Sequence, residues 1–270
     1  MVLTTEYRVL LPMSTSEYQV AHLYSVAEQS KDETGGGEGV EILKNEPFVD
    51  NKTGKKGQYT YKKISKSSRV PALIRKMAPE GSLTMFEESW NTYPDYKTTV
   101  TNGYLKDKFH ITITSRHLPY TGKFENPHHI PEDSNIERVL IDIANDSVGG
   151  DSECDPSIFI SEKTGRGALG ETWIDKGIAN LDKAPMMCCY KLVEVEFKVF
   201  LVQTQFERII QGKSKQIVTF FFRQLFCWMD KWYGMTIDEI RELEETTKKE
   251  LDDMYAKGKR KGMKLEEIEE

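Results

Sequence analysis

The chain has few cysteines and no long hydrophobic run, and each absence excludes a class of protein. Its 270 residues include four cysteines, at positions 154, 188, 189 and 227, with no C-x-x-C pair and no metal-ligand spacing. We therefore expect reduced thiols and no metal site. The apolar runs are too short for a membrane-spanning helix, and the N-terminus lacks a signal-peptide core. We expect a cytoplasmic protein whose contact with intracellular membranes is peripheral and transient.

The chain also lacks a long basic block and any recognisable catalytic motif. Its net charge of -6 argues against nucleic-acid binding. No G-x-S-x-G and no H-E-x-x-H occurs. The glycine-rich stretch TGGGEG at 34–39 has no Lys-Ser/Thr ending, and it follows a predicted helix and precedes a predicted strand, the reverse of a phosphate-binding loop. We interpret it as a flexible turn and predict no catalytic residue and no cofactor.

What the chain does contain is a set of alternating segments followed by two long helical ones. Strands are predicted over 6–12, 40–48, 57–65, 96–101, 108–117, 138–144 and 186–202. One helix is predicted to begin at the capping box Ser14-x-x-Glu17. Three further helices are predicted over 69–79, 203–232 and 236–256. Residues 145–185, rich in Gly, Asp, Ser and Pro, read as a long mobile loop. Residues 257–270 form a charged tail. This order predicts one α+β domain over 1–270 whose mostly antiparallel sheet wraps helices.

Several polar residues interrupt apolar faces in distant segments. In MMCCYKLVEVEFKVFLV, Lys191 is the only charge on the face that carries Val193 and Val195. A buried ammonium needs an anion or a wet cavity, although a lysine near a strand end can also reach water. Thr60 and Lys62 share one strand face, and Glu244 lies on the apolar stripe of the last helix. Together they indicate an apolar cavity with a polar end, suited to an amphipathic ligand.

Two aromatic or apolar features each allow two interpretations. The cluster in FFFRQLFCWMDKW is most simply core, and the alternative is a lipid-lined wall that includes Phe221. Val199 and Phe200, at the end of the apolar strand, are either an exposed membrane-docking tip or an ordinary strand end.

A set of stretches across the chain resembles a known family. EYRVLLP, ETGGGEGVEIL, MAPEG, WNTYP, KTGRGALG, YKLVEVEF and FRQLFCWMDKW together are similar to the class I phosphatidylinositol transfer proteins, from Met1 to about Met254. The resemblance implies an eight-stranded concave sheet with long helices that enclose one phospholipid, a START-like helix-grip fold. It also implies a monomeric carrier of phosphatidylinositol and phosphatidylcholine that is not an enzyme.

The resemblance also implies roles for individual residues. The inositol-contacting types fall on Thr60, Lys62, Asn91 and Glu244, and the phosphate and headgroup positions on His22, Tyr96, Thr98, Ser115 and Lys191. The membrane-docking pair falls on Val199 and Phe200, and a candidate phosphorylation site on Ser161.

Three positions depart from the family pattern. His22 replaces a glutamine, Tyr96 replaces a cysteine, and the docking pair is not Trp-Trp. The first two positions bear on the balance between phosphatidylinositol and phosphatidylcholine, and the third on membrane docking.

Two other functions stay open: an enzyme that acts on a lipid headgroup, and a sensor or presenter that supplies phosphatidylinositol to lipid kinases without net transfer.

Overall fold

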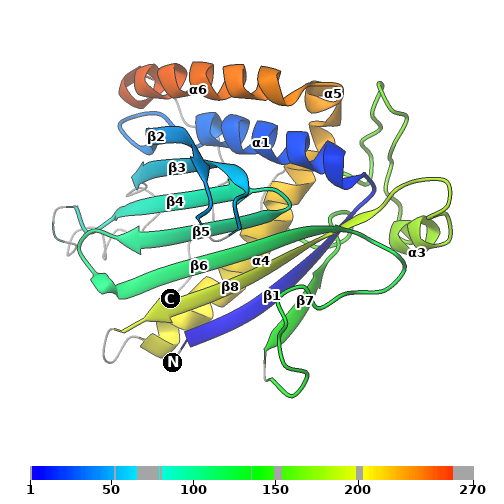
Figure 1. The fold of residues 1–270 in the computed structure, drawn as a ribbon, viewed down its shortest axis with the longest axis horizontal. Coiled ribbons are helices and arrows are strands. Elements are labelled where there is room, and N and C mark those ends of the chain that lie inside the picture. The colour runs from blue at the N-terminus through cyan, green and yellow to red at the C-terminus, as the bar shows by residue number, and fades with distance from the viewer. Residues whose placement is uncertain are drawn as a thin grey trace.

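Eight strands of the described chain form one open sheet (Figure 1). In this computed structural model, residues 2–51, 53–65, 79, 81–134, 136–148, 154–198 and 203–257 are described, with side chains of the last range from Gly212 onward. The strands are β1 (Val2–Leu11), β2 (Gly39–Val49), β3 (Lys56–Ser65), β4 (Thr84–Thr92), β5 (Asp95–Asn102), β6 (Lys106–Pro119), β7 (Glu137–Ile141) and β8 (Met187–Phe197). Their order is β2-β3-β4-β5-β6-β8-β1-β7, and β1–β7 is the one parallel pair among them. The predicted α+β class and its mostly antiparallel sheet are confirmed.

The helices lie along the sheet and beside one another. They are α1 (Thr15–Asp32), α3 (Trp173–Ile178), α4 (Gln203–Cys227), α5 (Met229–Trp232) and α6 (Ile237–Lys257). α1 and α6 run side by side, and α4 crosses the sheet at β8 and β1 (Figure 1). Within the described ranges, no helix combines the length and the apolar character needed to cross a bilayer.

Both predicted capping boxes are present. Ser14 and Glu17 exchange side chain-to-backbone hydrogen bonds at the start of α1. Thr236 and Glu239 do the same before α6, where the two bonds measure 2.7 and 3.2 Å. These bonds satisfy amide groups that a helix start leaves without partners, which fixes where each helix begins.

Sequence patterns missed one strand and overextended another. β4 was not predicted, because its inward positions are mostly polar. On the other face Phe86 stacks on Tyr61, and the Trp90 ring is tilted against that of Tyr59. The strand predicted over 186–202 ends at Phe197 in the described part. α3 lies inside the predicted loop 145–185. The predicted helix over 69–79 and the tail after Lys257 lie outside the described residues, except for Pro79.

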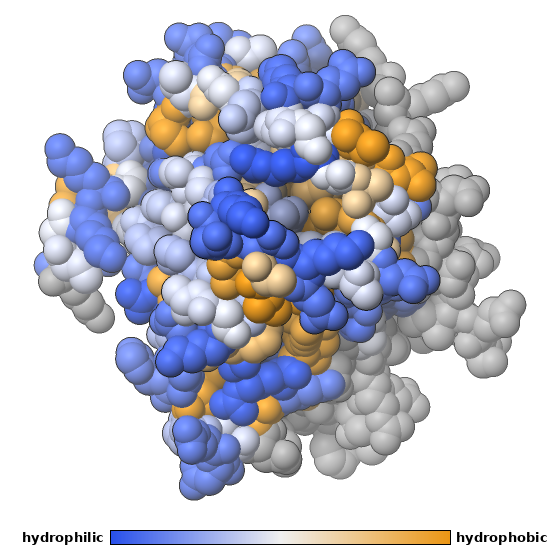
Figure 2. Space-filling model, turned by 90° about the vertical axis from the view of Figure 1, so that its right-hand side faces the viewer, coloured by the Kyte–Doolittle hydropathy of each residue, from blue (hydrophilic) through white to orange (hydrophobic). Residues whose placement is uncertain are grey.

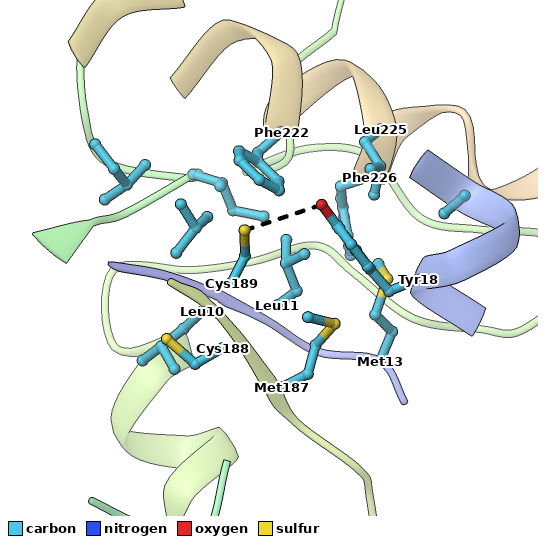
Figure 3. Packing of buried hydrophobic residues seen from close by; sticks show 14 of the residues in the cluster. Leu10, Leu11, Met13, Tyr18, Met187, Cys188, Cys189, Phe222, Leu225 and Phe226 are labelled. Carbon is cyan, nitrogen blue, oxygen red and sulfur yellow. Dashed lines mark hydrogen bonds between the residues drawn. The ribbon is translucent and has the colours of Figure 1, made fainter. Parts of the chain in front are cut away.

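The core lies where β1 and β8 meet α1 and α4 (Figure 3). Tyr18 of α1 donates a hydrogen bond to the sulfur of Cys189 at 4.0 Å, beside Phe222. Cys188 points to the opposite side of β8, as strand alternation requires (Figure 3). Both sulfurs are fully buried free thiols, and burial raises the pKa of each. They are therefore unreactive, as predicted.

Hydrophobic side chains on the outside are dispersed. Figure 2 shows the end of the molecule that carries α3 and α5, where hydrophobic residues gather in separate patches among hydrophilic ones. The large apolar area is inside, around a cavity.

Candidate ligand cavity

A cavity of about 430 Å³ lies between the sheet and helices α1, α4 and α6. It is lined by all of the residues predicted to contact inositol, phosphate or headgroup, and by Phe221: Thr60, Lys62, Asn91, Glu244, His22, Tyr96, Thr98, Ser115, Lys191 and Phe221. These residues come from segments as far apart as α1 and α6. Folding therefore brings together the polar groups that interrupt the apolar faces.

Strand register explains how the polar groups meet. One row of paired residues crosses the sheet and is polar throughout, in the order Gln58, Asn91, Tyr96, Ser115, Lys191. The next inward-facing row is polar on β2 to β5 and apolar beyond: Asn45, Thr60, Ser89, Thr98, Ile113, Val193. A third row runs Ile42, Lys62, Glu87, Val100, Ile111, Val195. Apart from Val100, these rows are thus polar over β3 to β5, and apart from Ser115 and Lys191 they are apolar over β6 and β8.

Asn45 connects the groups at the polar end nearest α6. Its amide nitrogen donates to Glu244 Oε2 at 3.2 Å, and its amide oxygen accepts from Thr60 at 3.2 Å and from Gln58 at 2.8 Å. Arg241, one turn before Glu244, pairs with the same carboxylate at 2.6 Å. Asn45 and Arg241 therefore fix the Glu244 carboxylate and the Thr60 hydroxyl relative to each other.

The polar end also holds two residues of β4 that sequence reasoning missed. Glu87 pairs with Lys62 at 3.6 Å, and Lys62 is 9% exposed. Ser89 and Thr98 share a hydrogen bond of 3.0 Å across the strand pair. A carboxylate beside the buried ammonium lowers the cost of burying it, while both groups still face the cavity.

Two histidines lie in the aromatic cluster beside this end. The His22 ring is 4.7 Å from Tyr96, and Tyr96 is 4.7 Å from His117. Burial lowers the pKa of His22 well below its usual range, and His117, Lys191 and Lys62 lower it further. Burial and Lys191 lower the pKa of His117 to about 3. Both imidazoles are therefore neutral at pH 7.

The Nδ1 atoms of both histidines have no hydrogen-bond partner in the described part of the chain, and the Tyr96 hydroxyl lies beside the Asn91 side chain. Burial raises the pKa of Tyr96, so its hydroxyl is a neutral donor. The positive potential that suppresses the imidazolium form also favours an anion at this place. The arrangement suits phosphate oxygens, which accept hydrogen bonds and carry negative charge.

Lys191 lies in the middle of β8, opposite Tyr7 and Ser115. It lines the cavity next to Val193 and forms no ion pair with a described carboxylate. The interpretation of a lysine at a strand end is therefore wrong: the side chain lines the cavity, and its contact with an anionic ligand stays a prediction. An unpaired ammonium at an apolar wall is costly unless an anionic ligand joins it.

The aromatic cluster is divided between the core and the cavity lining. Phe226 and Trp232 are buried in the core, whereas Phe221 and Phe222 line the cavity. Together with Val26 of α1 and with Ile111 and Val195 of the sheet, they form the apolar part of the cavity lining.

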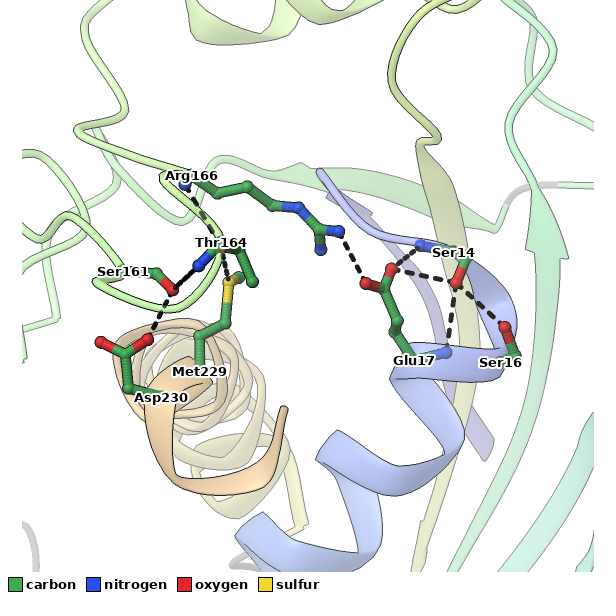
Figure 4. A network of polar contacts seen from close by, with 8 residues as sticks. All are labelled: Ser14, Ser16, Glu17, Ser161, Thr164, Arg166, Met229 and Asp230. Atoms are coloured by element: carbon green, nitrogen blue, oxygen red, sulfur yellow. Dashed lines mark hydrogen bonds and ion pairs between the residues drawn. The ribbon is translucent and has the colours of Figure 1, made fainter. Parts of the chain in front are cut away.

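Ser161 does not line the cavity. It lies in a segment whose side chains contact α5 and, through Arg166, α1 (Figure 4). Its hydroxyl is 1% exposed and donates to Asp230 of α5 at 2.6 Å. This bond, with the amides of Glu162 and Lys163, lowers the pKa of Asp230. Arg166 reaches across to Glu17 of α1 at 2.6 Å. Val199 and Phe200 lie outside the described residues.

The described residues contain no group of three or more His, Cys, Asp and Glu side chains suited to a metal ion. The cavity therefore offers hydrogen bonds, charge and apolar area to a ligand.

Comparison with known proteins gives consistent matches over nearly the whole chain. The model of the phosphatidylinositol transfer protein family matches residues 2–249. The chain is 48% identical to the beta isoform of phosphatidylinositol transfer protein from Bos taurus, over 99% of this chain and 100% of that protein. It is 49% identical to the Mus musculus beta isoform, over 97% and 98%. It is 44% identical to phosphatidylinositol transfer protein 2 from Dictyostelium discoideum, over 93% and 95%.

Proposed function

The chain belongs to the phosphatidylinositol transfer protein family, and from that premise we propose that it carries one phosphatidylinositol molecule between membranes. The observation that carries this proposal is the cavity with one polar end and one apolar wall. Its polar rows suit a headgroup, and its wall of Val, Ile and Phe suits acyl chains.

Within that cavity we assign the headgroup by charge and hydrogen bonding. Thr60, Lys62, Asn91 and Glu244 would contact the inositol hydroxyls, which both donate and accept. Lys191, with no carboxylate partner among the described residues, would pair with the phosphodiester. The second set near the phosphate comprises His22, Tyr96, Thr98 and Ser115.

Phosphatidylcholine is the proposed second cargo, because its phosphodiester would use the same lysine while its headgroup needs none of the inositol contacts. The choline cation would lie away from His22, since Lys62 and Lys191 create a positive potential there. Selection between the two lipids would thus depend on the polar end of the cavity near Glu244 and Asn45.

Acyl-chain burial sets the energy that a carrier has to manage. At about 0.8 kcal/mol per CH2 group, two chains represent on the order of 20 kcal/mol, which bars their bare passage through water. A closed cavity retains that burial and has to open at the bilayer.

We propose that α6 is the lid. A few polar contacts join its far half to neighbouring segments: Lys31 pairs with Glu250 at 2.9 Å, and the Gly37 amide donates to the Tyr255 carbonyl at 2.8 Å. The same half of α6 buries Leu251 and Thr247, each 1% exposed, so opening of the lid would have to expose these side chains.

Membrane contact would be brief and would be made through Val199 and Phe200. The carrier would work in the cytoplasm as a monomer and would bind no nucleic acid.

A phosphate on Ser161 would repel the carboxylate of Asp230 and release the segment that holds Arg166 on α1.

Two other functions make different predictions. An enzyme acting on the headgroup would change the lipid chemically, and a presenter would bind phosphatidylinositol without moving it between vesicles. Incubation of the purified protein with radiolabelled lipid, followed by chromatography of the lipid, separates carrier from enzyme. We propose the carrier, in which the lipid is recovered intact.

Native mass spectrometry of the protein purified from cells tests the proposal directly. We expect one phospholipid per chain, identified as phosphatidylinositol or phosphatidylcholine after extraction. A stable, uniformly lipid-free protein would contradict it.

A further inference from the structure

Two cysteine thiols meet where segment 154–169 packs on the end of α4. Cys227 is the last residue of α4, and its thiol is in hydrogen-bond contact with the thiol of Cys154. Both residues are partly exposed, in contrast to the fully buried Cys188 and Cys189. Neither cysteine is among the residues that line the ligand cavity.

Arg223 holds Cys154 in this place. It lies one turn before Cys227 on α4, so both side chains project from the same helix face. The Arg223 Nε atom donates to the Cys154 carbonyl at 3.4 Å, and its guanidinium pairs with Asp155 at 3.1 Å. The backbone of residues 154 and 155 is therefore fixed against the helix face that carries Cys227.

The rest of the segment is attached to α4 and α5 by side chains. The Phe159 ring lies edge-on to Phe226 at 5.7 Å, and Thr164 donates to the sulfur of Met229 at 3.1 Å. Ser161 is bonded to Asp230, as Figure 4 shows. Every one of these contacts is non-covalent, so a disulfide would add a covalent tie between the segment and α4.

We propose that Cys154 and Cys227 form a reversible redox site: a small-molecule disulfide such as oxidised glutathione converts them to a disulfide that ties segment 154–169 to α4. A disulfide requires Cβ atoms about 4 Å apart, and the contact between the two thiols brings these side chains together. Partly exposed disulfides are the ones that reduce readily, which suits a reversible site in a reducing compartment.

The chemistry is a thiol–disulfide exchange in two steps. The Cys154 contact and burial raise the pKa of Cys227, so Cys227 stays protonated at neutral pH. The Cys154 thiolate attacks the small disulfide, forms a mixed disulfide and releases one thiol. Cys227 then loses its proton, attacks the Cys154 sulfur and displaces the second thiol. Two protein thiols and one disulfide thus yield one protein disulfide and two small thiols.

The bond would lock the segment over α5. Ser161 is buried there, and any modification of its hydroxyl requires the segment to lift from Asp230. Oxidation of the cysteine pair would therefore protect Ser161 from a kinase. This consequence concerns one segment of the chain and does not depend on the lipid-transfer function.

The test treats the full-length protein with oxidised glutathione, then alkylates, digests and analyses it by mass spectrometry. We expect a cross-linked peptide pair containing Cys154 and Cys227, lighter by two hydrogen atoms than the reduced pair and separated again by dithiothreitol. Cys188 and Cys189 are the internal controls, since they should react with alkylating agent only after denaturation. The variants Cys154→Ser and Cys227→Ser should each keep a mixed glutathione disulfide on the remaining thiol.

Amide hydrogen exchange over residues 159–165 provides the second readout. It should slow on oxidation of the unsubstituted protein and stay unchanged in either variant. The proposal fails if the unsubstituted protein accumulates mixed disulfides without a cross-link, if neither cysteine reacts, or if the cross-link forms without slowing exchange in the segment.

Discussion

Lys191→Met separates ligand binding from stability better than any other single change. Lysine and methionine have similar length, and the side chain lies beside Val193 along an apolar wall. In the protein without lipid the change removes an ammonium that has no described carboxylate partner. Replacing such a charge by an apolar group of similar volume is neutral or stabilising. The melting temperature of the lipid-free protein should therefore stay the same or rise.

Lipid binding should respond in the opposite direction. A hydrogen bond to a charged group contributes about 1.5–3 kcal/mol, so loss of the phosphate contact should weaken phospholipid retention roughly 10- to 150-fold. Both phosphatidylinositol and phosphatidylcholine should be affected, because both contain the phosphodiester. The assay is transfer of each labelled lipid between vesicles, alongside thermal unfolding of the same preparation. Unchanged transfer, or a large drop in melting temperature with lost transfer, would refute the reasoning.

Three further changes test separate parts of the account. Lys62→Ala should lower phosphatidylinositol transfer and leave phosphatidylcholine transfer unchanged. The control is Lys63→Ala, which lies on the opposite strand face, pairs with Glu41 at 2.8 Å and should alter neither activity. If Lys62→Ala lowered the transfer of both lipids equally, Lys62 would have a folding role instead. Folding lowers the pKa of His22 and that of His117, the latter to about 3, so the unfolded chain takes up protons first as the pH falls. The contribution of these imidazoles to the free energy of unfolding is therefore complete above about pH 6.5 and falls by about 1.4 kcal/mol per pH unit per imidazole towards pH 3. Urea unfolding at several pH values should show a shallower dependence of this free energy on pH for His117→Gln. Changing Val199 and Phe200 together to Ala should reduce vesicle binding and transfer of both lipids with little change in melting temperature, and a large stability loss would assign the pair to the core.

Much of the fold follows from local sequence, because alternation and capping act over a few residues. The inward face of β8 and the starts of α1 and α6 were predictable for that reason. Lys191 was recognisable as an anomaly from its own strand. Its position across from Ser115 depends on the pairing of β6 with β8, which no single segment reveals.

Asn45 shows why part of the site could not be predicted. Simple alternation from Ile42 places Lys44 on the cavity face of β2. A register shift between Ile42 and Lys44 instead aligns Asn45 with Thr60, so the amide faces Glu244. A bulge of one residue reverses the face of every later side chain, and the sequence contains no clear signal for it.

Glu87 and Ser89 were missed for a different reason. On β4 the inward positions Glu87, Ser89 and Asn91 are polar, whereas Phe86 and Trp90 alternate onto the face that also carries Glu88. Hydrophobic periodicity assigns the buried face to apolar residues, so it fails where a sheet surrounds a cavity with a polar end.

The vesicle transfer assay is the most direct test of the central claim that the cavity carries one phospholipid between membranes. Donor vesicles containing labelled phosphatidylinositol are mixed with unlabelled acceptors and an amount of protein far below that of the lipid. The account predicts that each protein molecule moves many lipid molecules, all recovered chemically intact. Transfer no faster than in the absence of protein, by a folded protein that retains its lipid, would contradict it.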